Sequence, residues 1–279
     1  MACVRDFYRY IDSFAPFDTA ESYDNVGILA GCEEQQVHTC AVALDITEDT
    51  VRYAQERHAD LMISHHPVIF HPIKSVCEGN AVFSLVKNGM SALCAHTNLD
   101  LALGGTNDVL CSMLALTETE KLTGDQNELF CGRIGMLPQP MQPCEFASYV
   151  SERLGGVPVR YSDGGRKIRT VGVCTGHGAS FAEEAHRRGA DAFVTAEVKH
   201  DQMLFARQMG LTLLDAGHME TEDPVTDILL SRLKEKFPTV KFVRVPRDIL
   251  GIQTAGGYEK EGIIHGFGRG FSEPAAGGN

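Results

Sequence analysis

Short apolar runs alternate with amphipathic stretches along the first half of the chain. Residues 3–14 carry apolar side chains at helical spacing, which predicts a first helix. Short strands are predicted near 27–31 and at 39–46, 61–63 and 91–95. Helices are predicted after Thr47, which can cap one of them, and over 79–88 and 104–115. This rhythm favours an α/β fold with a parallel sheet covered by helices.

The same alternation returns after a polar, turn-rich stretch at 116–128, which we interpret as a domain boundary. Strands are expected at 131–137, 157–161, 168–174, 191–195, 211–215 and 240–245, and helices at 143–154, 179–188, 199–209 and 224–236. The tail from Gly251 is rich in glycine and polar residues and is expected to be loosely ordered. We therefore predict a first domain at 1–125, completed by the segment 240–279, and a second domain at 130–239.

Composition and charge exclude several classes of protein. Of the 279 residues, 43% are hydrophobic and 22% charged, and no apolar run approaches the ~18 residues of a membrane span. The apolar N-terminal stretch carries charges, unlike a signal peptide, so a cytoplasmic location is the default expectation. The net charge of −12 disfavours binding to nucleic acid or to an anionic membrane, but not to a small phosphorylated substrate beside a metal ion.

The nine cysteines contain no C-x-x-C pair, which argues against a zinc knuckle or a thioredoxin-type motif. Several of them, such as Cys40, Cys94 and Cys174, lie inside apolar runs. We interpret them as reduced, buried thiols of a cytosolic protein.

Two adjacent histidines, His65 and His66, follow the buried run Leu61-Met62-Ile63. Pro67 prevents the strand from continuing, so the pair lies in a loop at the carboxyl end of the strand. Ligands bind at that edge in open parallel sheets, and imidazole is a common metal ligand. By itself the pair is equally compatible with a surface turn.

Three further strands also end in groups that can bind a metal: His96 and Asp100 after the strand at 91–95, Glu197 and His200 after 191–195, and Asp215, His218 and Glu222 after 211–215. A histidine and a carboxylate four residues apart share one face of a helical turn. Among these groups, three imidazoles and two carboxylates exceed the needs of one open tetrahedral site and suit two neighbouring ions: His65, His66, Asp100, His218 and Glu222.

Each of these groups also has a simpler interpretation. His96 can orient a ligand rather than bind the metal, and this is the interpretation that we favour. Asp100 can cap the turn before Gly104. The segment with Glu197 and His200 can be a solvated helix start, and His218 with Glu222 can be an exposed helix N-terminus.

Together these motifs resemble the NIF-three-like family, whose members are also described as type 2 GTP cyclohydrolase I homologs. The resemblance runs from about residue 20 to residue 250. Its motifs are Tyr23-Asp24-Asn25-Val26-Gly27, Ser64-His65-His66-Pro67, His96-Thr97-Asn98-Leu99-Asp100, Gly132-Arg133-Ile134-Gly135, and Gly217-His218 with Thr221-Glu222.

The resemblance implies two similar α/β domains, with mixed or parallel sheets flanked by helices and a dinuclear metal site in the cleft between the domains. The ligands that it implies are His65, His66, Asp100, His218 and Glu222. It also implies a homohexameric ring, or toroid, built as a trimer of dimers. Two divalent ions per chain are expected, and the mixed ligands suit zinc, iron, manganese or nickel.

The sequence departs from the family pattern at Tyr23, where a tryptophan is usual, and at His177, where a small residue is common. We interpret the first departure as a change in packing. The expected activity is that of a GTP cyclohydrolase-like, metal-dependent hydrolase with a nucleotide-like or small phosphorylated substrate. His96, His177 and His200 are the candidates for proton transfer. The alternative is a protein that stores or delivers metal ions or serves as a regulatory scaffold.

Overall fold

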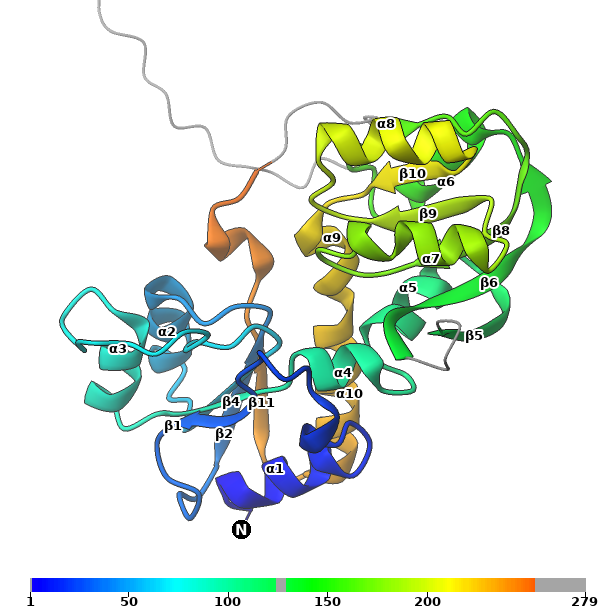
Figure 1. The fold of residues 1–279 in the computed structure, drawn as a ribbon. Coiled ribbons are helices and arrows are strands. Elements are labelled where there is room, and N and C mark those ends of the chain that lie inside the picture. Colours follow the sequence, from blue (N-terminus) through cyan, green and yellow to red (C-terminus); the bar gives the residue numbers. More distant parts are fainter. Residues whose placement is uncertain (1, 124–128, 254–279) are drawn as a thin grey trace, which may run out of the picture.

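Two β-sheets with helices on their faces make up the fold (Figure 1). The computed structural model describes residues 2–123 and 129–253. The first sheet has the strand order β1-β4-β3-β2-β11, and the second has the order β5-β6-β8-β9-β10-β7. The predicted α/β class with two helix-flanked sheets is therefore confirmed.

The first sheet is mostly parallel, and its three central strands are buried. Its strands are β1 (Gly27–Ala30), β2 (Thr39–Ala43), β3 (Leu61–Ser64), β4 (Ser91–Cys94) and β11 (Lys241–Arg244). Strands β4, β3, β2 and β11 run parallel, and β1 pairs antiparallel with β4. Every residue of β2, β3 and β4 is buried. Continuous apolar runs are expected for parallel strands that are covered on both faces, which is why the sequence pattern located them.

The second sheet is mixed. Its strands are β5 (Thr117–Thr123), β6 (Leu129–Met141), β7 (Arg160–Ser162), β8 (Ile168–Val173), β9 (Ala192–Thr195) and β10 (Thr212–Asp215). Strands β8, β9 and β10 are parallel, whereas β5, β6 and β7 pair antiparallel with their neighbours.

Strand β5 falls inside the polar stretch 116–128 that we had interpreted as a boundary. Its sequence, TETEKLT, is typical of an edge strand, and its many charged and polar residues are also typical of a loop. Leu122 is its buried apolar residue. Residues 124–128, and the tail beyond residue 253, lie outside the described residues. The domain limits remain a prediction.

The longer helices begin and end close to their predicted positions. They are α1 (Val4–Asp12), α2 (Glu48–Gln55), α3 (Ala81–Lys87), α5 (Thr106–Met113), α6 (Pro143–Arg153), α7 (Ala182–Arg187), α8 (His200–Met209) and α10 (Pro224–Lys236). Thr47 caps α2 as predicted, because its hydroxyl accepts a hydrogen bond from the Thr50 N–H at 3.3 Å. Across the described ranges, none of the helices is both long and apolar enough to cross a bilayer.

Two five-residue helices, α4 (Thr97–Leu101) and α9 (His218–Glu222), were not among the predicted helices, although a helix N-terminus was one interpretation of His218 with Glu222. Each is little more than one turn, which is too short to produce a periodic apolar pattern. Both follow the carboxyl end of a strand: α4 follows β4 and α9 follows β10. They carry three of the five proposed metal ligands.

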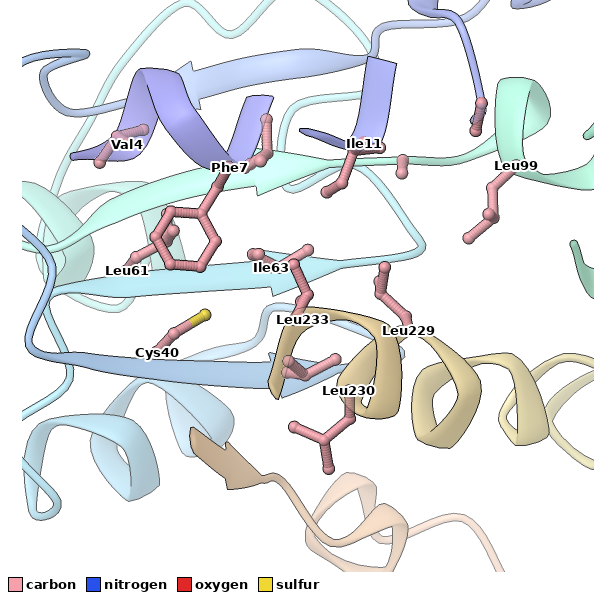
Figure 2. Close-up of a cluster of buried hydrophobic side chains, with 14 of the residues drawn as sticks. Val4, Phe7, Ile11, Cys40, Leu61, Ile63, Leu99, Leu229, Leu230 and Leu233 are labelled. Carbon is pink, nitrogen blue, oxygen red and sulfur yellow. The ribbon is translucent and has the colours of Figure 1, made fainter. Parts of the chain in front are cut away.

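Helices from opposite ends of the chain pack on one face of the first sheet (Figure 2). Helix α1 contributes Val4, Phe7 and Ile11, and α10 contributes buried leucines of which Leu233 is fully enclosed. The chain passes from the second sheet through α10 to β11, which completes the edge of the first sheet beside β2 (Figure 1). The first sheet is thus assembled from both ends of the described chain.

Phe7 is the large aromatic side chain at the centre of this core, with no exposed surface and its ring stacked on Phe237 at 4.2 Å. Phe7→Ala is expected to lower the free energy of unfolding by about 3–5 kcal/mol, because it removes buried contacts and leaves a cavity. The same change at Phe205, a ring that is 50% exposed on α8, is expected to cost less than about 0.5 kcal/mol. Urea denaturation of both variants measures the difference; equal losses would contradict it.

Candidate metal centre

The five side chains proposed as ligands lie together around one carboxylate. Glu222 Oε2 is 2.8 Å from His66 Nε2, 2.9 Å from His218 Nε2 and 3.8 Å from His65 Nε2. His65 Nε2 also lies 3.5 Å from Asp100 Oδ1. Glu222, Asp100 and His65 are buried, with 4%, 6% and 1% of their surface exposed. His66 and Glu222, which are 156 residues apart in the sequence, thus meet in one cluster.

Parallel strands of both sheets bring these groups together. Strand β3 ends at Ser64, so the two adjacent histidines follow at its carboxyl end. Helix α4 follows β4 and carries Asp100, and α9 follows β10 and has His218 and Glu222 as its first and last residues. The carboxyl ends of parallel strands share one edge of a sheet, where loops can carry polar side chains. The ligand set therefore combines such an edge from each sheet.

Each histidine of the set is held through its Nδ1 atom. The Nδ1 partners are Ala95 O for His65 at 2.9 Å, Asp45 Oδ1 for His66 at 2.7 Å, and Glu197 Oε1 for His218 at 3.0 Å. When the Nδ1–H donates a hydrogen bond to a carbonyl or carboxylate, the lone pair of Nε2 remains free to bind a metal ion. All three Nε2 atoms face Glu222.

The surroundings of the His65 Nε2 atom indicate whether a cation fits this cluster. It is buried and has no hydrogen-bond partner among the residues that the structure describes. A buried polar atom without a partner is unfavourable, and here it lies among carboxylates that would share a bound cation. The donor set of imidazole nitrogens and carboxylate oxygens is the one that zinc and related metals take. The residues present therefore fit a metal ion.

His96 lies at the edge of the same cluster. Its ring centre is 5.1 Å from that of His65 and 5.6 Å from that of His66. Its Nδ1 atom is 2.9 Å from Asp24 Oδ1, so this ring is held in the same way as the other three. Within residues 2–123 and 129–253, two groups have a spacing that could hold a metal ion, His65-His66-His96 and His66-His218-Glu222, and His66 belongs to both.

Gly176 shows how closely the backbone approaches the cluster. Its φ is +60°, and a Cβ atom added there would lie 2.0 Å from Glu222 Oε1 and 3.2 Å from His218 Nε2. Only glycine avoids both the strained backbone and the clash. The loop after β8 therefore depends on Gly176 to close over the carboxylate.

Three carboxylates hold the histidines; the sequence did not indicate Asp24 or Asp45 as site residues, and it offered Glu197 as a candidate ligand with a simpler interpretation. Asp24 was interpreted only as turn chemistry, Asp45 was included in a strand, and Glu197 was assigned to a solvated helix start. Glu197 has a φ of +54°, which is rare for a residue with a side chain and often marks a functional position. Asp45 comes soon after the end of β2, so the same rule that located His65 could have indicated it.

The other predicted residues lie at the surface. His177 has its side chain 54% exposed and its Nδ1 3.5 Å from the second oxygen of Glu197, so it adjoins His218 through this carboxylate. His200 begins α8 with an exposed side chain and, in the described part of the chain, is not a member of the cluster. Tyr23 is 67% exposed, so its interpretation as a packing change is wrong.

The charges of the cluster compensate one another. Burial by itself would raise the pKa of Glu222, but hydrogen bonding to His218 and the other nearby histidines hold this pKa well below its usual value. Burial would lower the pKa of His66, yet hydrogen bonds to Asp45 and Glu222 raise it to about 10. The same balance, with Glu222 as the main partner, raises the pKa of His218 to about 8. Without a metal ion, the raised pKa values of His66 and His218 therefore favour the protonated imidazoles at neutral pH.

Comparison with known proteins identifies relatives over nearly the whole chain. The family model Duf34/NIF3 (NGG1p interacting factor 3) matches residues 2–248. A protein of Clostridium perfringens named GTP cyclohydrolase 1 type 2 homolog is 30% identical over 86% of this chain and 95% of its own length. A Streptomyces coelicolor protein of the same name is 34% identical over 81% and 83%. Hypothetical protein SA1388 of Staphylococcus aureus, 24% identical, shares the fold with a TM-score of 0.82 over 91% of this chain and 99% of its own.

Asp45→Asn is expected to weaken metal binding by about 10- to 100-fold, because the amide no longer fixes the tautomer and orientation of His66. Asp49→Asn on α2 is the matched control, since this exposed carboxylate pairs with Arg52 and not with the cluster. Competition with a chelator measures both affinities. An unchanged affinity in Asp45→Asn would mean that His66 keeps its orientation without this contact.

Metal affinity is expected to rise with pH between about 6.5 and 10, because the ion must displace protons from His66 and His218. Both pKa values are raised above the unfolded value of about 6.5. The protonated forms therefore stabilise the metal-free fold fully below pH ~6.5. This contribution is lost as pH rises through about 8 for His218 and about 10 for His66.

Chelator competition across this pH range tests the predicted metal affinity. Thermal unfolding of the metal-free protein across the same range tests the predicted stability. His38→Gln is the control, because this histidine is 65% exposed and outside the cluster. Affinity that stays flat over the range would contradict the prediction.

Proposed function

Since the chain belongs to the Duf34/NIF3 family, we propose that it is a dinuclear metal-binding protein and a metal-dependent hydrolase. The observation that carries the proposal is the convergence of three imidazole Nε2 atoms on one buried carboxylate, with every Nδ1 atom already engaged. Such a set is costly to bury unless a cation or protons complete it. The substrate proposed is nucleotide-like or another small phosphorylated molecule.

The number of donor groups supports two ions rather than one. His65 Nε2 lies 3.5 Å from Asp100 Oδ1, and the Nε2 atoms of His66 and His218 lie 3.3 Å apart. We propose that these five side chains are the ligands and that Glu222 is shared. When bound, two such ions supply Lewis-acid polarisation of a substrate oxygen and activation of water.

Residues of the chain itself would bind the substrate and move protons. His96 and His177 each have one nitrogen held by a carboxylate and a ring that is not fully buried, so either can exchange a proton with a bound molecule. His200 is the third candidate, and its position on the exposed start of α8 requires a substrate that extends beyond the cluster. The name of the curated relatives refers to GTP, which supports a nucleotide-like substrate for this chain.

The alternative proposal is a protein that stores or delivers metal ions or serves as a regulatory scaffold. Both proposals need the same ligands, so the site alone does not separate them. For either one we also propose the family's homohexamer, a toroid formed as a trimer of dimers, and a cytoplasmic location. Light scattering at micromolar concentration should then give roughly six times the chain mass of 30.4 kDa.

The proposal predicts about two metal ions per chain and turnover that depends on them. Glu222→Gln should lose both metal and turnover, because the amide removes the shared negative charge. Glu183→Gln, at an exposed carboxylate on α7, should retain both. Elemental analysis and a panel of nucleotides and phosphoesters provide the measurements. One ion or fewer at saturation would contradict the dinuclear site, whereas two ions without turnover would favour the alternative.

A further inference from the structure

An exposed aromatic surface adjoins the candidate metal centre. Tyr23 is 67% exposed and Phe70 is 39% exposed. Their ring centres are 6.5 Å apart, and Phe70 lies 6.2 Å from the ring of His96. His96 in turn lies 5.1 Å from His65. A continuous path of rings therefore leads from the surface to the ligands.

Polar contacts, rather than core packing, hold this surface in position. Asp24, next to Tyr23, accepts hydrogen bonds from the Thr97 N–H and hydroxyl and contacts His96 Nδ1. Asn25 Nδ2 donates to the carbonyl oxygen of Ile69, next to Phe70, at 2.5 Å. The turn at 23–25 thus connects both aromatic positions to the metal centre, and the carboxylate that orients His96 also anchors Tyr23.

Neither ring is a member of the described hydrophobic clusters. Large aromatic side chains that are exposed yet held at a polar site are typical of binding surfaces, because they offer contact area with little loss of conformational freedom. Their position beside the proposed ligands, and their fixation through Asp24, favour a ligand that also reaches the metal centre. This argues for a substrate group rather than for a core contact.

We propose that Tyr23 and Phe70 form a stacking site for a planar heteroaromatic ring of purine size, carried by a substrate whose phosphate or other polar end reaches the cluster. The inference rests on the proposed function and assigns the ring-binding part of that same site. A nucleobase stacks on aromatic side chains through its π-face, and this interaction depends little on which base it is. The two rings are inclined at 65° to each other, so a planar group can stack on one of them at a time.

A fluorescent purine makes the stacking visible. The chain contains no tryptophan, so 2-aminopurine riboside triphosphate can be excited with little emission from the protein. Its fluorescence is quenched when the ring stacks. We expect quenching on titration with the metal-loaded protein, and displacement of the probe by GTP. Inorganic tripolyphosphate carries the same phosphate chain without a ring and is therefore expected to compete less well.

Variants distinguish the contribution of the ring to binding from the contribution of the phosphates. Tyr23→Ala and Phe70→Ala should each weaken probe binding by about 10-fold or more, while the affinity for tripolyphosphate and the metal content stay unchanged. Tyr23→Phe should retain the binding. Tyr161→Ala is the matched control, because Tyr161 is also exposed, at 40%, but lies on β7.

The outcomes distinguish this inference from the proposed hydrolase activity. Quenching that depends on Tyr23 and Phe70 supports the stacking site even if the protein turns over no substrate. No quenching by the wild-type protein, or equal losses for the probe and tripolyphosphate, would overturn it, even if phosphoesters are hydrolysed. A change in particle mass in the two alanine variants would assign the pair to a contact between copies of the chain, which also overturns it.

Discussion

Burial of the Glu222 carboxylate among three imidazoles is the interaction on which the rest of the structure depends. A buried carboxylate is strongly unfavourable unless opposite charges and hydrogen bonds compensate it. Here the carboxylate follows a strand of the second sheet, and its partners His65 and His66 follow a strand of the first. The compensating groups come from a different sheet, so the cluster forms only when the ends of both sheets meet.

The residues around the cluster restrict it further. Each ring has its Nδ1 atom engaged, so the imidazoles keep the orientation in which Nε2 faces the carboxylate. Gly176 lets the loop after β8 approach Glu222, where any side chain would collide with it. Glu197 holds His218 from a backbone conformation that is normally left to glycine. Strain of this kind persists where the surroundings determine the geometry, and it is common at functional sites.

The fold supplies rigid supports for this arrangement. Strands β2, β3 and β4 are buried along their whole length, so the loops at their carboxyl ends are held by a packed core. Helix α10 follows the short helix α9 with only Asp223 between them, and it packs on the first sheet. The element that carries His218 and Glu222 is therefore connected directly to the core beneath the two adjacent histidines. A rigid scaffold with functional groups on its loops is the usual way to hold such a site.

The sequence by itself determined the α/β class and nearly all of the longer elements, and it supplied the five ligands that remain a proposal. Continuous apolar runs identify buried parallel strands. The polar residues that directly follow two of these runs, His65-His66 and His96 through Asp100, can therefore be recognised in the sequence. The pattern missed β5, whose polar edge resembles a loop, and the helices α4 and α9, which are too short to show a period. Local patterns of this kind report burial and periodicity within a segment only.

Only the tertiary structure decided which carboxylates hold the histidines and where the aromatic residues lie. Asp24, Asp45 and Glu197 are ordinary turn or strand-end residues until the fold brings each one within about 3 Å of an imidazole that lies 21 to 72 residues away. Tyr23 likewise has a large aromatic side chain of the kind that is often buried in a core, and only the folded chain shows that it is exposed beside Phe70. Contacts between distant segments depend on how the sheets pack, and no periodicity within a segment records them.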